Sequence, residues 1–166
     1  MAVGQADLLQ SINAVWDAST LDALFKALWP ATPGGDDFSV LHDALAGGEQ
    51  PWPYCIFDVQ PGSISDRMSK GTNDLWRTED IPVEFKVFAT EVSGDSRSAK
   101  GIAAYLVEEI MKVFGGHPTV TPDDLVLDNG NHLVTLYQTA FYIREDNAHW
   151  MGSVSYLFRL DIPEMA

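Results

Sequence analysis

Residues 82–114 read PVEFKVFATEVSGDSRSAKGIAAYLVEEIMKVF, and they hold the most regular strand pattern and the most regular helix pattern of the chain. Apolar and charged residues alternate near the start of this stretch: Val83, Glu84, Phe85, Lys86 and Val87. Successive side chains of a strand point to opposite faces, so this alternation gives one apolar face and one charged face. Residues 83–89 are therefore predicted to form a strand with one buried face.

The second part of the same stretch carries apolar residues at the spacing of one helix face. They are Ala99, Ile102, Ala103, Leu106, Ile110, Val113 and Phe114. Asp95 or Ser96 can cap the start of this helix, and Gly115 and Gly116 can end it. We therefore expect a helix over residues 96–114 that packs on the sheet.

Two short helices are predicted upstream, at the start of the chain. Apolar residues recur at helical spacing over residues 8–16 and again over residues 21–28, and Ser19 can cap the second helix. Residues 30–53 are rich in Pro, Gly and Asp, and their middle part fits a short strand or a helical turn. Residues 54–60, YCIFDVQ, then predict a strand.

The last third of the chain predicts a pair of strands. Residues 132–145, HLVTLYQTAFYIRE, are rich in β-branched and aromatic residues, and residues 150–162, WMGSVSYLFRLDI, alternate between apolar and polar types. The short connection between them fits a hairpin, which makes the two strands antiparallel. A further short strand near Leu125 is an optional element.

These elements fit a single domain over residues 1–166. The predicted order is two helices, two strands, one helix and two strands. We expect an α+β fold with a mainly antiparallel four- to five-stranded sheet, one long helix packed on a face, and short N-terminal helices.

Residues 61–80, PGSISDRMSKGTNDLWRTED, lack a regular pattern and are predicted to form a long loop. Loops of this length in compact domains are usually functional or disordered. This one combines bases with apolar residues: Arg67, Met68, Lys70, Trp76 and Arg77. Arginine near an aromatic residue is typical of interfaces, so these residues are candidates for a subunit or partner interface. The open alternative is that Trp76 folds back onto the core.

The chain is strongly acidic, with 24 acids, 10 bases and a net charge of −14. Such a surface repels phosphate backbones, which argues against a direct DNA-binding role. Residues 1–50 hold one base against seven acids, whereas six of the ten bases fall within residues 67–100. Asp36 and Asp37 are candidates for an acidic surface that meets the basic loop of a neighbouring copy. The alternative is that the acidity only keeps the protein soluble.

The sequence offers no motif for catalysis, metal binding or cofactor binding. Residues 34–37, GGDD, lack the flanking strands of a metal-binding hairpin, and residues around Gly130 do not match the spacing of a calcium loop. The four histidines lack the spacing of a zinc site, and the single Cys55 lies in an apolar run typical of a buried residue. We therefore predict no catalytic residue, no metal and no cofactor, and no enzymatic role. No apolar stretch approaches the roughly 20 residues of a membrane span.

The pattern of elements resembles the tail terminator, or tail completion, proteins of long-tailed bacteriophages. Besides the helical start, four segments carry the resemblance: PYCIFDV at 53–59, PVEFKVFAT at 82–90, SRSAKGIAAYLVEEIMKVF at 96–114 and HWMGSVSYLFRL at 149–160. The resemblance extends over residues 5–162 and includes no catalytic signature. Residues 30–50 are longer and more acidic than the pattern, so no functional residue is carried over from the family.

The resemblance implies a structural role in a virion. Such proteins form a homo-oligomeric ring, a hexamer, that closes the head-proximal end of the tail tube, ends tube polymerisation and offers the joining surface for the head. The implied partners are other copies of the chain, the tail tube protein, and a head–tail connector or neck protein. DNA would pass through the lumen without specific binding, no membrane would be involved, and the protein would be made in the host cytoplasm before it joins the virion tail.

Two alternatives to the tail terminator remain open from the sequence. The first is another neck or head-completion protein. The second belongs to a different class: a small-molecule-binding α+β domain or an enzyme with an aromatic pocket lined by residues such as Tyr137, Tyr142 and Trp150.

Overall fold

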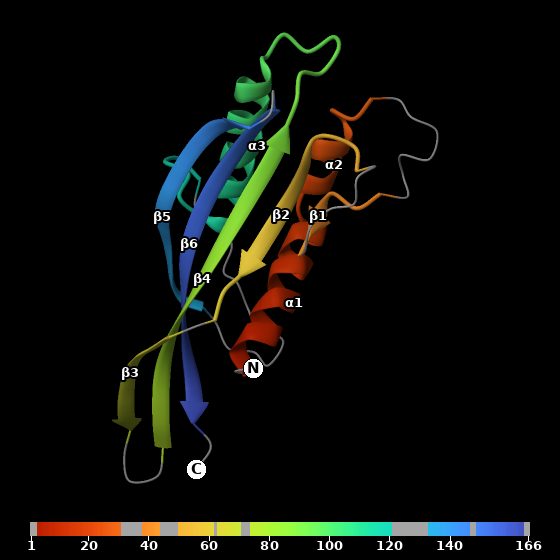
Figure 1. Ribbon diagram of the computed structural model, residues 1–166. Helices are drawn as coiled ribbons and strands as arrows, with labels where there is room; N and C mark the ends of the chain where they lie inside the picture. Colours follow the sequence, from red (N-terminus) through yellow and green to blue (C-terminus); the bar gives the residue numbers. More distant parts are fainter. Residues whose placement is uncertain are drawn as a thin grey trace.

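The computed structural model describes residues 3–30, 38–43, 50–61, 63–70, 74–120, 133–146 and 149–164 (Figure 1). The side chains are described over residues 8–30, 38–43, 50–61, 79–120 and 149–159. The helices of these parts are α1 (Val3–Ala18), α2 (Leu21–Lys26) and α3 (Ala99–Phe114). The strands are β1 (Leu41–His42), β2 (Tyr54–Val59), β3 (Ser63–Lys70), β4 (Asp74–Ala89), β5 (Leu133–Asp146) and β6 (His149–Glu164).

The strands form one six-stranded sheet in the order β1-β2-β4-β6-β5, and β3 pairs with β4 beside this path. All pairings are antiparallel except that of β1 with β2, which is parallel. The sheet confirms the predicted α+β class, the mainly antiparallel pairing and the C-terminal strand pair. It also settles the middle of residues 30–53, where the short strand β1 forms. The optional strand near Leu125 lies outside the described residues.

One face of the sheet is buried beneath the helices. Figure 1 shows α3 alongside β4 and β6, and α1 and α2 beside β1 and β2. The three helices and this sheet face share one apolar cluster. The strands contribute Cys55, Phe57, Ile81, Val83, Phe85, Val87, Ala89, Val154, Tyr156 and Phe158 to the cluster. The helices contribute mainly Leu8, Ile12, Trp16, Leu21, Phe25, Ile102, Leu106, Val107, Ile110 and Phe114. The period-two pattern predicted for residues 83–89 is therefore confirmed.

Helix α3 lies very close to β6. A Cβ atom added at Gly152 would meet Val107 Cγ2 at 2.7 Å and the carbonyl oxygen of Ala103 at 3.3 Å. The packing thus requires a residue without a side chain at this point of β6. The Tyr156 hydroxyl donates a hydrogen bond to the Gly115 carbonyl oxygen at 2.7 Å, which ties the end of α3 to the same strand.

The start of α3 differs from the prediction. Neither Asp95 nor Ser96 caps it: the cap is Ser98, whose hydroxyl accepts a hydrogen bond from the Gly101 amide at 3.2 Å. The Asp95 carboxylate instead accepts from the amide and the guanidinium of Arg97, so it closes the turn before the helix. Gly115 ends the helix as predicted, with a φ of 122° that favours glycine.

The largest difference concerns the region predicted as a long loop, which forms a β-hairpin. Strand β3 pairs with the first part of β4, and that part of β4 also pairs with the end of β6 on its other side. The sequence of β3, SISDRMSK, has a single β-branched residue, Ile64, and no aromatic residue, so it lacks the composition that marks a strand. Its conformation comes from pairing with a partner strand that is already held in the sheet. This is why a reading of local pattern missed it.

The hairpin, together with the end of β6, extends the sheet beyond the helices (Figure 1). We call this part the projection: β3, residues 74–80 of β4 and residues 160–164 of β6. Within the projection, the structure describes the backbone pairing and the side chains of Glu79 and Asp80 at its base.

Candidate functional site

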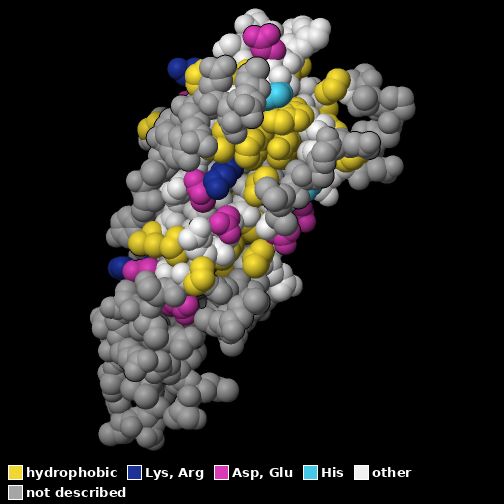
Figure 2. Space-filling model, viewed as in Figure 1, with side chains coloured by type: hydrophobic (Ala, Val, Ile, Leu, Met, Phe, Trp, Pro, Cys, Tyr) yellow, Lys and Arg dark blue, Asp and Glu magenta, His cyan; other side chains and the backbone are white. Residues whose placement is uncertain are grey.

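The face of the sheet that points away from the helices is a large surface with no helix over it in the described part of the chain. We call it the open face. It carries the alternate residues of β2, β4 and β6: Tyr54, Ile56, Asp58, Glu84, Lys86, Phe88, Met151, Ser153 and Ser155. Figure 2 views this face, where hydrophobic side chains gather beside a histidine and charged side chains lie below them.

Aromatic rings cross one end of the open face. Trp52 stacks on His149 with ring centroids 4.3 Å apart, and Tyr54 stacks on Phe88 at 5.0 Å. Trp52 also meets the edges of Tyr54 at 5.0 Å and of Phe88 at 6.1 Å, while His42 of β1 meets Tyr54 at 6.1 Å. All five rings are half-buried. We call this set, His42, Trp52, Tyr54, Phe88 and His149, the aromatic row.

The register explains how these rings come together. Tyr54 of β2 pairs with Phe88 of β4, and Phe88 pairs with Met151 of β6, two residues after His149. Burial raises the pKa of the Tyr54 hydroxyl, which stays protonated at neutral pH. The row therefore presents partly exposed rings, among them Trp52, Tyr54 and Phe88, which are residue types enriched at protein interfaces.

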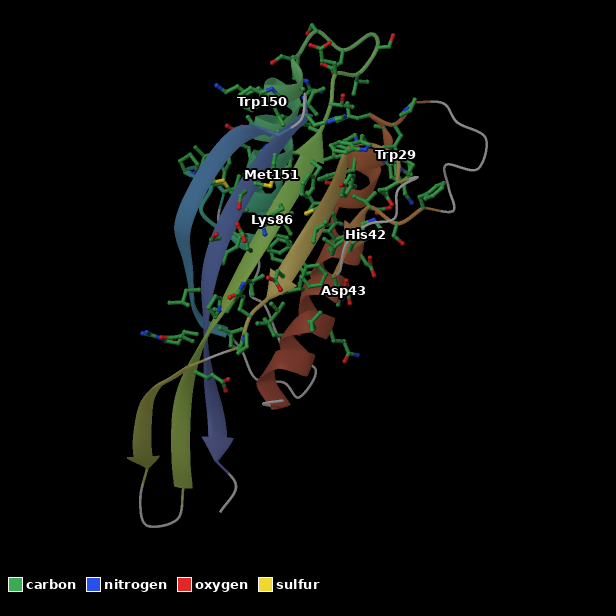
Figure 3. The ribbon with its side chains drawn as sticks, in the orientation of Figure 1. Trp29, His42, Asp43, Lys86, Trp150 and Met151 are labelled. Atoms are coloured by element: carbon green, nitrogen blue, oxygen red, sulfur yellow. The ribbon has the colours of Figure 1, made fainter. Side chains whose placement is uncertain are left out.

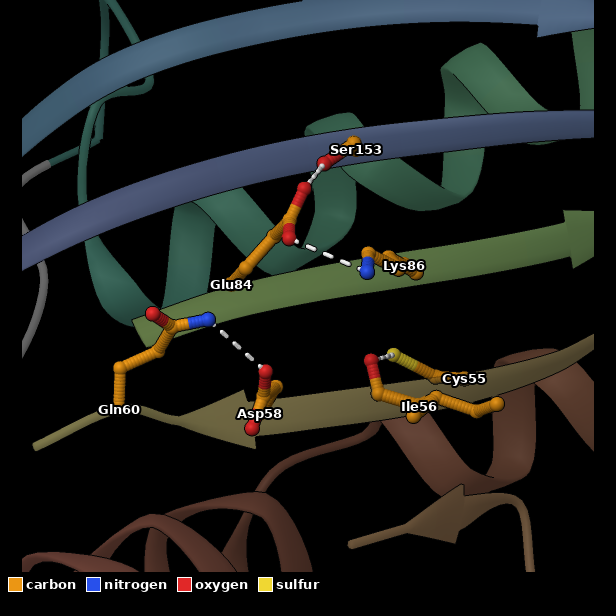
Figure 4. Close-up of polar contacts among 7 residues, drawn as sticks. All are labelled: Cys55, Ile56, Asp58, Gln60, Glu84, Lys86 and Ser153. Atoms are coloured by element: carbon orange, nitrogen blue, oxygen red, sulfur yellow. Dashed lines mark hydrogen bonds and ion pairs between the residues drawn. The ribbon is translucent and has the colours of Figure 1, made fainter. Parts of the chain in front are cut away.

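Charged and polar side chains occupy the rest of the open face (Figure 4). The Ser153 hydroxyl donates to Glu84 Oε1 at 2.6 Å, and Lys86 Nζ lies 3.2 Å from Glu84 Oε2. Closer to the projection, Arg159 donates to both carboxylate oxygens of Asp80, at 2.7 Å and 3.0 Å. Through these contacts, each of the four charged side chains has an oppositely charged partner within the chain: Glu84 with Lys86, and Asp80 with Arg159.

Two exposed carboxylates lie on or next to the strands that carry His42 and Tyr54. Asp58 lies two residues beyond Ile56 on β2 and accepts a hydrogen bond from the Gln60 side chain at 3.1 Å. Asp43 follows His42 at the end of β1, and Figure 3 shows His42 and Asp43 beside β1.

A pocket of about 730 Å³ opens on the other side of Trp52, between the end of α2 and the segment that follows β4. Its lining includes Trp29, Gln50, Trp52 and Val92. The indole nitrogen of Trp29 donates to the Pro53 carbonyl oxygen at 2.8 Å, which fixes one wall. The pocket is mainly apolar, so it suits an apolar group rather than a charged one.

The structure brings five of the predicted interface residues onto one hairpin. In its backbone register Arg67 pairs with Arg77, Met68 with Trp76, and Lys70 with Asp74. The side chain of Trp76 lies outside the described part, so its packing onto the core stays a prediction. Asp36 and Asp37 lie outside the described residues altogether, so their predicted role stays a prediction.

The aromatic pocket suggested for a small-molecule-binding domain involves residues that the structure places apart in register. Tyr137 pairs with Leu157, and Tyr142 pairs with Ser153, but their side chains lie outside the described part. Trp150, near the start of β6, pairs with Ala89, and Nζ of Lys100 on α3 lies 5.2 Å from its ring centroid. Trp150 therefore belongs to the helix-covered side of the sheet.

Cys55 is fully buried, and burial raises the pKa of its thiol. Such a thiol is a poor nucleophile, in line with its interpretation as a buried apolar residue. Within the described residues, no group of three or more His, Cys, Asp or Glu side chains is arranged to hold a metal ion. No helix in this part of the chain is both long enough and apolar enough to cross a membrane.

The aromatic row was missed by the sequence reasoning. A signal for it existed, since Tyr54 and Phe88 are aromatic residues at strand positions that belong to the solvent-facing side of the alternation. The row also depends on Trp52 and His149, and only the fold brings these residues next to β2 and β4.

No protein-family model matches the chain, and no curated protein sequence matches it. Among solved structures, the chain is similar to a chain from the virion of a native gene transfer agent (GTA) particle. The two are 19% identical, the alignment covers 95% of this chain and 94% of that one, and the TM-score is 0.49.

Proposed function

We propose that this chain is a structural protein of a phage-like virion, and more narrowly a tail terminator. In this role it caps the head-proximal end of the tail tube, ends tube polymerisation and forms the surface to which the head joins. The observation that carries the proposal is the order of elements: helical start, β2, β4, α3 on one sheet face, and a closing β5–β6 pair. This is the pattern on which the resemblance to tail terminators rests.

The proposed role requires a closed ring of identical subunits. Ring contacts are heterologous, so one surface of each subunit must meet a different surface of the next. The chain offers unlike surfaces for this purpose: the projection with Arg67, Met68, Lys70, Trp76 and Arg77, and the acidic N-terminal part. In that part Asp17 is exposed, and Asp22 is partly exposed with Lys26 Nζ 2.9 Å away. We keep a hexamer as the expected ring, on the resemblance alone.

Deletion of the gene in the strain that produces the particles tests the role. We expect tails of uncontrolled length without heads, seen by electron microscopy, and recovery of normal particles when the wild-type gene is supplied. Tails of normal length that fail to join heads would instead favour a neck or head-completion protein. Complete, infectious particles without the gene would contradict every virion role.

The pocket beside Trp29 and Trp52 is the observation that favours the different class, a small-molecule-binding domain. Under such a role, a ligand should bind tightly to the pocket and quench tryptophan fluorescence. Trp29→Ala should abolish this binding. Under a structural role, addition of a cell extract should leave the melting temperatures of the wild-type protein and of Trp29→Ala unchanged.

A further inference from the structure

The apolar pocket beside Trp52 has walls that the fold holds in place. Trp29 follows the end of α2 (Figure 3), and its indole N–H donates to the Pro53 carbonyl oxygen at 2.8 Å. Trp52 stacks on His149 with ring centroids 4.3 Å apart. The volume of about 730 Å³ lies in the range of ligand-binding pockets. Because both indole rings are already positioned, little conformational freedom is lost when an apolar group enters between them.

Gln50 is the buried polar residue of the pocket wall. Its Nε2 donates to the carbonyl oxygens of Ser39 at 3.0 Å and Pro51 at 3.3 Å. Both partners are acceptors, which fixes the amide nitrogen on their side. Within the described residues the Gln50 Oε1 accepts no hydrogen bond, and it is not sealed from solvent. Gln50 therefore offers an acceptor, and its complement is an N–H donor on the ligand.

Glu91 is the single charged residue among the described residues that line the pocket. It is exposed, so it lies at the mouth, and its carboxylate makes no ion pair or hydrogen bond within the described part of the chain. Lys26 Nζ lies 5.9 Å from the Trp29 ring centroid, but it is paired with Asp22 at 2.9 Å. The mouth thus carries an unbalanced negative charge on a chain of net charge −14, which attracts a base.

We propose that this pocket is the docking site for a segment of a partner protein in the virion that presents an apolar side chain next to a lysine or arginine. The apolar side chain enters beside Trp29 and Trp52, and the base stays at the mouth and pairs with Glu91. A backbone N–H of the same segment donates to Gln50 Oε1. One peptide supplies all three groups from neighbouring residues. The proposal rests on the proposed virion role, and it names a surface by which the chain binds a partner.

Titration of the purified full chain with short peptides tests this site. The probe is acetyl-Gly-Leu-Arg-Gly-amide at millimolar concentration, and the indole N–H signals of ¹⁵N-labelled protein report its binding. We expect the signals of Trp29 and Trp52 to shift, while that of Trp16, which is buried in the core, stays in place. A peptide with Gln in place of Arg should bind more weakly, and so should one with Ser in place of Leu.

Two pairs of variants locate the contact. Glu91→Gln should weaken binding of the Leu-Arg peptide about two- to fivefold, as expected for an exposed ion pair, and should leave binding of the Leu-Gln peptide unchanged. Glu108→Gln, exposed on α3, is the matched control and should change neither. Ala27→Phe, at an exposed position of the pocket lining, should block both peptides. Ala18→Phe, exposed at the end of α1, should block neither.

Three results would overturn the proposal. They are the absence of shifts at Trp29 and Trp52 with the Leu-Arg peptide, equal binding of the Leu-Gln and Leu-Arg peptides, and binding that Ala27→Phe leaves intact. Equal binding of the two peptides would mean that the pocket accepts any apolar group, as a small-molecule site does.

This test and the deletion of the gene fail independently. If the deletion gives overlong tails while the Leu-Arg peptide shifts neither indole signal, the tail-terminator role stands and the docking site is wrong. If the peptide binds as expected but the deletion leaves particles intact, the docking site stands and the virion role is wrong.

Discussion

The two faces of β4 are made of alternate residues of one strand, and they differ in almost every respect. On the helix-covered face, Ile81, Val83, Phe85, Val87 and Ala89 are at most 1% exposed. On the open face, Glu84, Lys86 and Phe88 are half-buried and contact neighbours of the same sheet. The backbone pairing is shared, so the difference arises from α3, which covers one face only. Apolar residues on the covered face hold the fold together, whereas Phe88 on the open face stays partly exposed.

Substitution of Phe85 should have the largest effect, and Phe88 provides the matched control. Phe85→Ala removes a fully buried ring that packs on Phe57, Phe114 and Tyr156, so it should cost about 3–5 kcal/mol of unfolding free energy. Phe88→Ala removes a half-buried ring and should cost about 1–2 kcal/mol. Urea unfolding measures both values. Equal losses for the two variants would contradict the division into a folding face and an assembly face.

Gly152→Ala should give the next largest loss. The added methyl group must displace Val107 and approach the Ala103 backbone, so α3 has to shift from β6. Overpacking of this kind costs about 1–3 kcal/mol. In a chain of this length each kcal/mol lowers the melting temperature by about 2–4 °C. An unchanged melting temperature would mean that α3 does not lie this close to β6.

Tyr156→Phe should have a smaller effect on the same face. It leaves the ring in place and removes the hydroxyl that donates to the Gly115 carbonyl oxygen. The buried acceptor loses its partner, which costs about 1–2 kcal/mol. The pKa of this hydroxyl is raised by burial, so the absorbance of the wild-type tyrosine should not titrate until the protein unfolds in alkali. Titration of all tyrosines in the folded state would contradict the buried position of Tyr156.

The smallest effect concerns Asp95, in the turn before α3. Hydrogen bonds from the Arg97 side chain, with a further bond from the Arg97 amide, lower the pKa of this carboxyl from 3.8 to about 2. A carboxyl whose pKa is lower in the folded state stabilises the fold above its unfolded pKa, and this contribution is lost as the pH falls from 3.8 to 2. Carboxyl NMR should show the low pKa, and Arg97→Ala should raise it toward 3.8. An Asp95 pKa that does not respond to Arg97→Ala would rule out this contact.

Most of the fold follows from local pattern, because the strands and helix of the core bury one face each. The alternation of residues 83–89 and the apolar stripe of α3 reflect this burial directly. The hairpin does not follow from it, since β3 has a polar sequence and owes its conformation to pairing with β4. The aromatic row could not be assembled from the sequence for a related reason. His42, Trp52, Phe88 and His149 come from separate segments, and the sheet order that joins them is set by nonlocal pairing.

The most direct test of the claim that the open face serves assembly is the length of tails made with Phe88→Ser in place of the wild-type protein. Purified Phe88→Ser should be folded, with a melting temperature a few degrees below that of the wild type. Particles made with it should show overlong tails without heads by electron microscopy, while Lys100→Ser, altered on the helix-covered side, should support normal particles. Normal tail lengths and joined heads with Phe88→Ser would contradict the account.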